Sequence, residues 1–341
     1  MKGTLLSLAP VATEELVASL GGRPFHARIA RREVFERGVL DYAEMSALPA
    51  GLRELLTAEL PILTAVEESR SVAQDGTTKL LLRYPDGATV ETVHIPSRRP
   101  KRGATLCVST QVGCPVGCPF CASGKLGLKR NLEAHEIVEQ FLLGRAIGPV
   151  SRSVVMGIGE PLLNYAALSA ALEIVHDELG LGARRITVST VGFPERLRKI
   201  APTRPPFQLA ISLHTPDDEQ RAELVPTMAG VPIAEILAAG DDWFERTGRE
   251  ITYEYVLLGG VNDTRGHATR LAERLRGRRA TVNLIPYNPI EKDLYERPSR
   301  EAVDRFHRGL TEAGIVATVR WSRGVEAEAA CGQLRLRRTE G

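Results

Sequence analysis

The sequence predicts an α/β fold, a partial (β/α)6-type barrel with a small N-terminal helical domain and a connecting β-hairpin. From residue 104 onward, short β-rich runs alternate with helical stretches, the pattern of repeated βα units around a parallel sheet. The units number about six, too few for a closed eightfold barrel of about 250 residues. Before residue 104 the chain shows helical periods and then a hairpin, so we expect a separate unit there.

Three regions follow from this change of pattern. They are a helical domain over 1–70, a hairpin with a basic linker over 71–103, and the barrel with a C-terminal segment over 104–341. In the first region the apolar periods predict three helices, with Thr13 as the N-cap of the first, over 13–20, 28–37 and 52–60. The hairpin has a Pro85-Asp86-Gly87 turn between strands 79–84 and 89–95.

Within the barrel region, apolar runs predict strands and helices in alternation. The predicted strands are 104–109, 153–156, 185–189, 208–213, 251–257, 281–285 and 315–320. The predicted helices are 134–144, 166–179, 233–246, 265–276 and 300–313.

Composition places the chain among ordinary globular proteins, with 341 residues, 43% hydrophobic and 25% charged residues. The apolar patch at the N-terminus is broken by Pro10 and is too short for a secretion signal or a membrane span, so we expect a cytoplasmic protein. Three of the five cysteines fall within eight residues, which favours metal binding in a reducing compartment over a disulfide framework.

The formal net charge of +2 neither demands nor excludes a nucleic-acid partner, so local charge matters more. Three basic runs stand out, at Arg98–Arg102, Lys125–Arg130 and Arg335–Arg338. Each run by itself is typical of a solvated surface. Their nearness in sequence to cysteines favours RNA contact instead.

The three clustered cysteines are Cys114, Cys118 and Cys121, in a Cys-x3-Cys-x2-Cys pattern on a Gly- and Pro-rich loop after the first barrel strand. Barrel enzymes build their sites at such carboxyl ends of strands. A 4Fe–4S cluster held by three cysteines keeps one iron open, and that iron can chelate the amino and carboxylate groups of S-adenosylmethionine. The pattern therefore indicates a cluster that cleaves this cofactor.

A structural zinc site is the alternative reading of these cysteines. Such a site usually has four closed ligands, often from two Cys-x2-Cys knuckles. The chain has no second knuckle, but His94 or His135 could supply a fourth ligand, so zinc stays open at this point.

Other strand ends carry polar residues in the same register as the cysteine loop. Glycines after the second strand let backbone approach a ligand, and Glu160 offers an acceptor to an ammonium group. Each residue alone is typical of a turn or a cap, but together they indicate a cofactor site. They are Gly159, Glu160, Ser189, Ser212, His214 and Asn288.

Glu91 stands where an apolar side chain is expected. Strand alternation puts it on the face of Val93 and Ile95, so it is either a solvent-facing glutamate on an edge strand or a base held beside a reaction centre. Periodicity alone does not separate these two possibilities.

These residues and motifs resemble the RlmN/Cfr family of radical S-adenosylmethionine RNA methyltransferases, and most closely the RlmN branch. The resemblance spans nearly the whole chain. The motifs that carry it are VETVHIP, TLCVSTQVGCPVGCPFCASGKLGLKRNL, VVMGIGEPLLN, ITVSTVG, LAISLHTP, EYVLLGGVND, NLIPYNP and EAEAACGQL. The last of these and TLCVSTQVGC account for the two cysteines outside the cluster motif, Cys331 and Cys107.

The resemblance implies a radical SAM barrel and a set of roles. Cys331 accepts a methyl group from one S-adenosylmethionine, and a second molecule is cleaved at the 4Fe–4S cluster, giving two per turnover. Glu91 takes the proton from the adenine carbon, and Cys107 resolves a covalent RNA adduct through a transient disulfide with Cys331. The implied cofactor-binding positions are Gly159, Glu160, Ser189, Ser212, Leu213, His214 and Asn288.

The resemblance also implies adenine-C2 methylation of 23S rRNA and of tRNA by a monomer, with flavodoxin or ferredoxin as electron donor. In this reading the helical domain over 1–70 is an accessory domain that binds RNA. Cfr-like C8 methylation is the nearest alternative. Two further alternatives belong to other functional classes. One is a non-catalytic iron–sulfur or zinc protein that binds RNA, and the other is a radical enzyme that acts on protein or small molecules. The pair Cys107 and Cys331 favours the RNA methyltransferases. Trp321 and Val325 depart from the usual RlmN pattern and bear on the choice of RNA.

Overall fold

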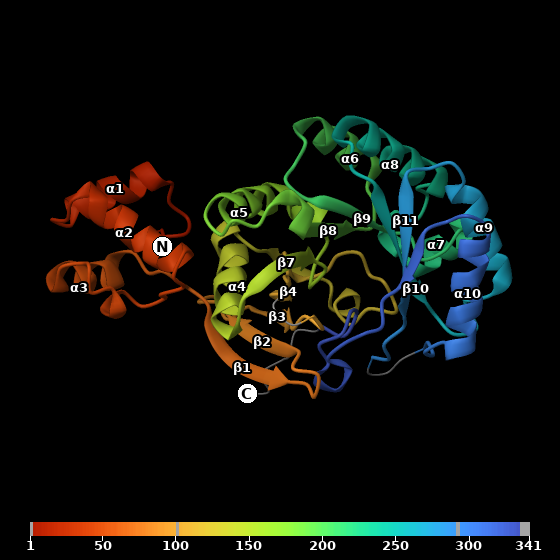
Figure 1. The fold of residues 1–341 in the computed structure, drawn as a ribbon, viewed down its shortest axis with the longest axis horizontal. Coiled ribbons are helices and arrows are strands. Elements are labelled where there is room, and N and C mark those ends of the chain that lie inside the picture. Colours follow the sequence, from red (N-terminus) through yellow and green to blue (C-terminus); the bar gives the residue numbers. More distant parts are fainter. Residues whose placement is uncertain (1–2, 100–101, 291–293, 335–341) are drawn as a thin grey trace.

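The computed structural model describes residues 3–99, 102–290 and 294–334, and its N-terminal part is helical. Helices α1 (Pro10–Ser19), α2 (Pro24–Phe35) and α3 (Ala50–Glu59) stand at the three predicted places and pack beside the barrel (Figure 1). The predicted cap was wrong: the N-cap of α1 is Ala9, because Pro10 begins the helix. Thr13 lies inside it, and its hydroxyl donates to the Ala9 carbonyl at 3.0 Å.

Two arginines join the helical unit to the helices of the barrel, α4 (Ala134–Ile147) and α5 (Tyr165–Asp177). Arg31 of α2 is 7% exposed, and its Nη2 lies 2.5 Å from Glu178 Oε1, at the end of α5. Arg145 of α4 donates to the Phe35 carbonyl at 2.7 Å. Helical unit and barrel share one continuous apolar core.

The described strands of the main sheet run in the order β1-β2-β3-β4-β7-β8-β9-β10-β11-β12. From β4 onward neighbouring strands are parallel, and β12 ends the sheet without pairing to the other end. This open, parallel arrangement confirms the predicted partial barrel. The parallel strands are β4 (Ala104–Cys107), β7 (Val150–Val155), β8 (Ile186–Thr190), β9 (Gln208–Ser212), β10 (Ile251–Leu257), β11 (Ala280–Pro286) and β12 (Ala317–Val319).

Helices follow the strands and cover the outside of the sheet (Figure 1). Besides α4 and α5, the predicted helices correspond to α8 (Ile233–Thr247), α9 (Arg265–Leu275) and α10 (Arg300–Glu312). The sequence pattern predicts neither α6 (Pro194–Ile200) nor α7 (Asp218–Leu224), since seven residues are too few to show a helical period. No helix among the described residues combines the length and apolar character needed to cross a membrane.

The predicted hairpin is present as β2 (Thr78–Arg83) and β3 (Thr89–Ile95), and it extends the barrel sheet itself. Strand β3 pairs with β4, with Val93 opposite Cys107, so β3 is not an edge strand. A further strand, β1 (Val66–Val72), pairs with β2 and contains residue 70, the expected domain boundary. No strand is predicted there because its residues are mostly polar and exposed.

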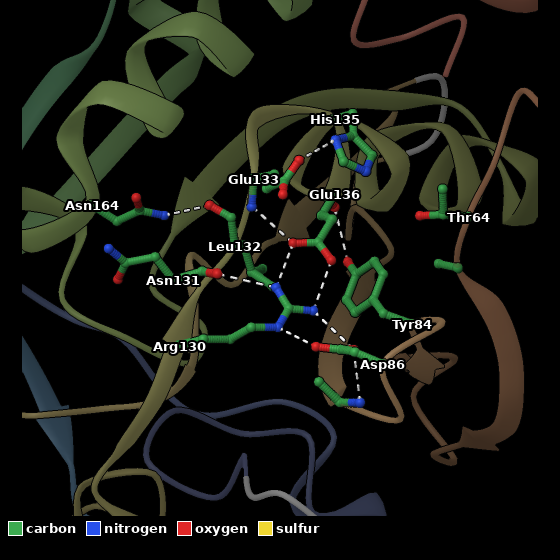
Figure 2. A network of polar contacts seen from close by, with 12 residues as sticks. Thr64, Tyr84, Asp86, Arg130, Asn131, Leu132, Glu133, His135, Glu136 and Asn164 are labelled. Carbon is green, nitrogen blue, oxygen red and sulfur yellow. Dashed lines mark hydrogen bonds and ion pairs between the residues drawn. The ribbon is translucent and has the colours of Figure 1, made fainter. Parts of the chain in front are cut away.

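A second, two-stranded sheet brackets the loop with the three clustered cysteines. Strands β5 (Gln111–Gly113) and β6 (Leu128–Asn131) enter and leave that loop. In β6, the Arg130 guanidinium bridges Asp86, in the hairpin turn, and Glu136, in the first turn of α4 (Figure 2). The Tyr84 hydroxyl donates to the Glu136 carbonyl at 2.9 Å. Arg130 therefore anchors the cysteine loop, although the basic run that contains it was expected to favour RNA contact.

Candidate active site

The three clustered cysteines and the predicted polar strand ends meet in one cavity of about 160 Å³, called here the inner cavity. Because the strands are parallel, their carboxyl ends open on the same side of the sheet as the cysteine loop. The predicted residues that line it are Cys114, Cys118, Cys121, Gly159, Glu160, Ser189, Ser212, His214, Asn288 and Cys331. Leu213 is fully buried outside the lining, and its backbone N–H donates to the Glu254 carbonyl at 3.0 Å.

Gly113 closes the backbone of the cysteine loop at a position where no other residue fits. Gly113 has a φ of +81°, and a Cβ there would lie 1.9 Å from the Gly127 carbonyl oxygen. That carbonyl accepts a hydrogen bond from Cys114 N at 3.0 Å. The loop thus turns tightly and directs its cysteines into the inner cavity.

The clustered thiols lie beside a buried cation, Arg221, whose hydrogen-bonding capacity is not filled. Burial raises the pKa of the Cys114 thiol to about 12 and that of Cys118 well above its ordinary value, so iron would have to displace these protons. The Arg221 cation opposes the shift at Cys118, and its Nε and Nη1 are buried without a hydrogen-bond partner. An anionic cluster–thiolate group beside this guanidinium fits both observations.

A zinc site fits less well. Within the described ranges, no three His, Cys, Asp or Glu side chains converge on one point that could hold a single ion. A cubane differs because each cysteine binds a separate iron. Neither histidine that could complete a zinc tetrahedron lines the inner cavity: His94 lies in β3 beside Gly148, and His135 pairs with Glu133.

Glu160 stabilises the wall of the inner cavity through hydrogen bonds. Its carboxylate accepts hydrogen bonds from the Thr190 hydroxyl at 2.6 Å, from Val191 N at 2.9 Å and from Leu162 N at 2.9 Å. Burial raises the pKa of Glu160, and these three donors oppose the shift. The sequence indicated an acceptor for a ligand's ammonium group, whereas the structure shows a carboxylate already bonded to two neighbouring loops.

His214 is held in the neutral form. Burial and the nearby Arg221 cation lower its pKa to about 3. Its Nδ1 accepts from Val256 N at 3.2 Å, and its ring meets the edge of Phe120 at a centroid distance of 5.1 Å. Its φ of +67° is unusual for a residue other than glycine, and such a conformation persists only where the surrounding contacts impose it.

Cys331 connects the inner cavity to a larger one of about 460 Å³, called here the outer cavity, because it lines both. Its carbonyl accepts from Asn288 Nδ2 at 3.0 Å, which holds the C-terminal segment 324–334 against the strand ends. Cys107 lines the outer cavity from β4. The structure therefore brings together the two cysteines that stand apart in sequence, and both are free thiols.

The outer cavity has a cation beside its thiols. Arg320, directly after β12, lines it and interacts electrostatically with Cys331 and Cys107. Burial raises the pKa of Cys107 to about 12, the charge of Cys331 adds to the shift, and Arg320 opposes it. A guanidinium in this place favours the thiolate form, which is the nucleophilic one.

Glu91 lies on the same face of the sheet as Cys107 but lines neither cavity. It is 1% exposed, and Lys79 Nζ lies 2.9 Å from its Oε1. The reading of Glu91 as a solvent-facing residue on an edge strand was wrong, since β3 is paired on both sides. Lys79 also donates to the Glu328 carbonyl at 3.1 Å, in the segment that carries Cys331.

The sequence reasoning missed several residues of the two cavities. Glu254 and Thr190 line the inner cavity, and burial raises the pKa of Glu254 to about 7. Arg320 lines the outer cavity, and Lys79, which lines neither cavity, is the buried partner of Glu91. Glu254 and Lys79 are charged residues inside otherwise apolar strands, the same signal that singled out Glu91.

Comparisons with known proteins show which family the chain is similar to. A family model described as the radical SAM superfamily matches residues 108–272. A probable dual-specificity RNA methyltransferase RlmN from Parasynechococcus marenigrum is 43% identical, over 98% of this chain and 99% of its own length. The protein of the same name from Gloeobacter violaceus is 45% identical, over 97% and 95%.

Among solved structures, a radical SAM methyltransferase from Sphaerobacter thermophilus superposes with a TM-score of 0.92 at 42% identity, covering 97% of this chain and 99% of that one. Membership of the superfamily implies a 4Fe–4S cluster and S-adenosylmethionine, as expected from the cysteine motif. The predicted enzyme class is thereby confirmed. The chain belongs to the RlmN family of radical SAM RNA methyltransferases.

Proposed function

We propose that this enzyme methylates C2 of an adenosine in RNA, 23S rRNA and also tRNA, through a methyl group carried on Cys331. The observation that supports this most is the position of Cys331, which lines both the inner cavity and the outer cavity. A thiol in that place can receive a methyl group on one side and meet a substrate near Cys107 on the other.

In this proposal Cys114, Cys118 and Cys121 hold the cluster. Gly159, Glu160, Ser189, Ser212, Leu213, His214 and Asn288 form the surroundings of S-adenosylmethionine. When bound, the cluster and the cofactor supply a carbon-centred radical, which is needed because an sp² carbon such as adenine C2 is a poor nucleophile. Two cofactor molecules are used per turnover, one for the methyl group and one for the radical.

Three side chains carry out the remaining steps. Cys331 carries the methyl group and becomes joined to the adenine carbon through it. Glu91 removes the proton from that carbon, and one electron returns to the redox partner that supplied it. The Cys107 thiolate then attacks the Cys331 sulfur, so that a transient disulfide forms while the bond between this sulfur and the methylene carbon breaks. The methylene carbon takes up a proton and becomes the methyl group of the released RNA. Because Glu91 is 1% exposed and lines neither cavity, adenine reaches it only after the residues that cover it move.

Mass spectrometry of adenosines from RNA treated with reconstituted enzyme tests the proposal directly. We expect 2-methyladenosine, formed only with S-adenosylmethionine and a reductant such as reduced flavodoxin or ferredoxin, and absent with Cys331→Ala. Formation of 8-methyladenosine would favour the Cfr-like alternative. We also propose that the enzyme acts as a monomer in the cytoplasm, whose reducing conditions keep its thiols free.

A further inference from the structure

The outer cavity has a rim of exposed arginines that the proposed chemistry does not use. Arg98, Arg152 and Arg185 line this cavity and are exposed. None of the three forms an ion pair with another residue in the part of the chain that the structure describes. Arg323 also lines the cavity, but it forms an ion pair with Asp75, in which Nε lies 2.8 Å from Oδ2. Three unpaired cations around one hollow form a surface for an anion.

A tryptophan stands in the same rim. Trp321 directly follows Arg320, lines the outer cavity and is 37% exposed. The Arg300 guanidinium carbon lies over its ring, 5.5 Å from the centroid. A cation over one face orients the indole, and the exposed part of the side chain is accessible to another flat group. Aromatic rings next to arginines are the usual means by which proteins hold single-stranded nucleic acid.

We propose that Trp321 stacks against the base of the nucleotide next to the target adenosine, while Arg98, Arg152 and Arg185 bind the neighbouring phosphates. This inference rests on the proposed function, because it places RNA over the outer cavity. The hollow leads to Cys107 and Cys331, and a single nucleotide can occupy about 460 Å³, whereas an acidic protein surface needs a broad, flat contact. Trp321 thus becomes a positioning residue for the adenosine.

The two tryptophans of the chain allow a direct optical test. Trp243 is fully buried in α8, stacks on Phe207 with a centroid distance of 5.6 Å and does not line the outer cavity. In a Trp243→Phe variant, Trp321 is the only indole, and its fluorescence reports on its own surroundings. We expect quenching when a short single-stranded RNA with one adenosine is added. An abasic residue beside the adenosine should abolish the quenching.

Binding measurements separate stacking from simple charge. Trp321→Ala should weaken binding of the same RNA about tenfold, equivalent to about 1.4 kcal/mol, and Trp321→Phe should retain most of the affinity. The matched control is Val316→Ala, since Val316 is also exposed, at 62%, next to β12 but lines neither cavity. Arg152→Gln should lower the slope of log affinity against log salt by about 0.7, whereas Trp321→Ala should leave that slope unchanged.

The outcomes distinguish failure of RNA stacking on Trp321 from failure of the proposed function. If the parent enzyme methylates RNA but Trp321→Ala binds it as tightly and no quenching occurs, the stacking inference is wrong and the proposed function stands. Unchanged RNA affinity with weakened binding of flavodoxin would assign this rim to a protein partner and overturn the inference. A parent enzyme that neither binds nor methylates RNA contradicts both proposals.

Discussion

Lys79 and Glu91 form a buried ion pair in which Nζ lies 2.9 Å from Oε1 and the side chains are 4% and 1% exposed. The same ammonium group donates to the Glu328 carbonyl, so the pair ties the sheet to the segment that carries Cys331. Removing one partner of a buried pair leaves an uncompensated charge, which costs about 3–5 kcal/mol. Substitutions at either residue therefore need a stability measurement beside the kinetic one.

Glu91→Gln should leave methylation of Cys331 intact and lower RNA methylation at least about a hundredfold, because glutamine keeps the shape but is not a base. Intact-protein mass spectrometry and RNA product analysis give the two readouts. Glu67→Gln, on exposed β1, is the matched control and should act normally. The double variant Lys79→Met/Glu91→Gln should unfold closer to the parent temperature while staying inactive. Near-normal turnover of Glu91→Gln would contradict the role as a base.

Cys107→Ala should trap a covalent protein–RNA adduct. Alanine removes the thiol that breaks the methylene bridge, while the cluster cysteines and Cys331 are untouched, so the reaction proceeds to the adduct and stops. Denaturing electrophoresis with labelled RNA should show the adduct only with S-adenosylmethionine and reductant, and Cys107→Ala/Cys331→Ala should show none. Release of methylated RNA at the parent rate without an adduct would rule out the two-cysteine mechanism.

Resolution of the adduct should become faster as the pH rises. Burial raises the pKa of Cys107 to about 12, so at lower pH the attacking thiolate is the minor form and its fraction grows about tenfold per pH unit. Arg320→Met removes the opposing cation, raises that pKa further and should slow resolution at a fixed pH. Decay of the adduct in single-turnover experiments across a pH series measures this, and a flat profile would speak against Cys107 as the attacking group.

Anaerobic reconstitution should give one 4Fe–4S cluster per chain, because the Cys-x3-Cys-x2-Cys loop alone has cluster spacing. Iron and sulfide analysis with absorption spectroscopy measures the loading, and Cys118→Ala should lose it. Cys107→Ala is the control and should load normally. Stoichiometric zinc without iron or sulfide would disprove the assignment of the three cysteines.

Arg130→Met should destabilise the cysteine loop. It removes the guanidinium that bridges Asp86 and Glu136, of which only Glu136 is well buried, so we expect about 2 kcal/mol after allowing for solvent screening at Asp86. Chemical unfolding measures the loss, and cluster loading should fall with it. Arg198→Met is the matched control, because its ion pair with Asp242 is exposed on both sides. Equal losses of stability in the two variants would show that Arg130 does not stabilise the cysteine loop specifically.

The sequence by itself determined those features of the fold and of the candidate site that depend on local patterns. Apolar runs and helical periods located all seven parallel strands that the structure describes and five of their helices, because buried parallel strands keep short apolar runs and amphipathic helices keep a period of 3.6 residues. The cysteine spacing needed no tertiary knowledge either, since the three cysteines lie on one short loop. The sequence did not predict strand β1, because its side chains are mostly exposed. Burial therefore imposes no alternation of apolar and polar residues along it.

Only the tertiary structure decided how distant residues meet. The pairing of β3 with both β2 and β4 makes Glu91 a buried partner of Lys79, whereas alternation alone allowed a solvent-facing residue. Likewise, Arg320 and Cys331 reach Cys107 across more than two hundred residues of chain. Such contacts depend on strand order and on the path of the C-terminal segment, which are set by long-range packing and leave no mark on local hydrophobic periods.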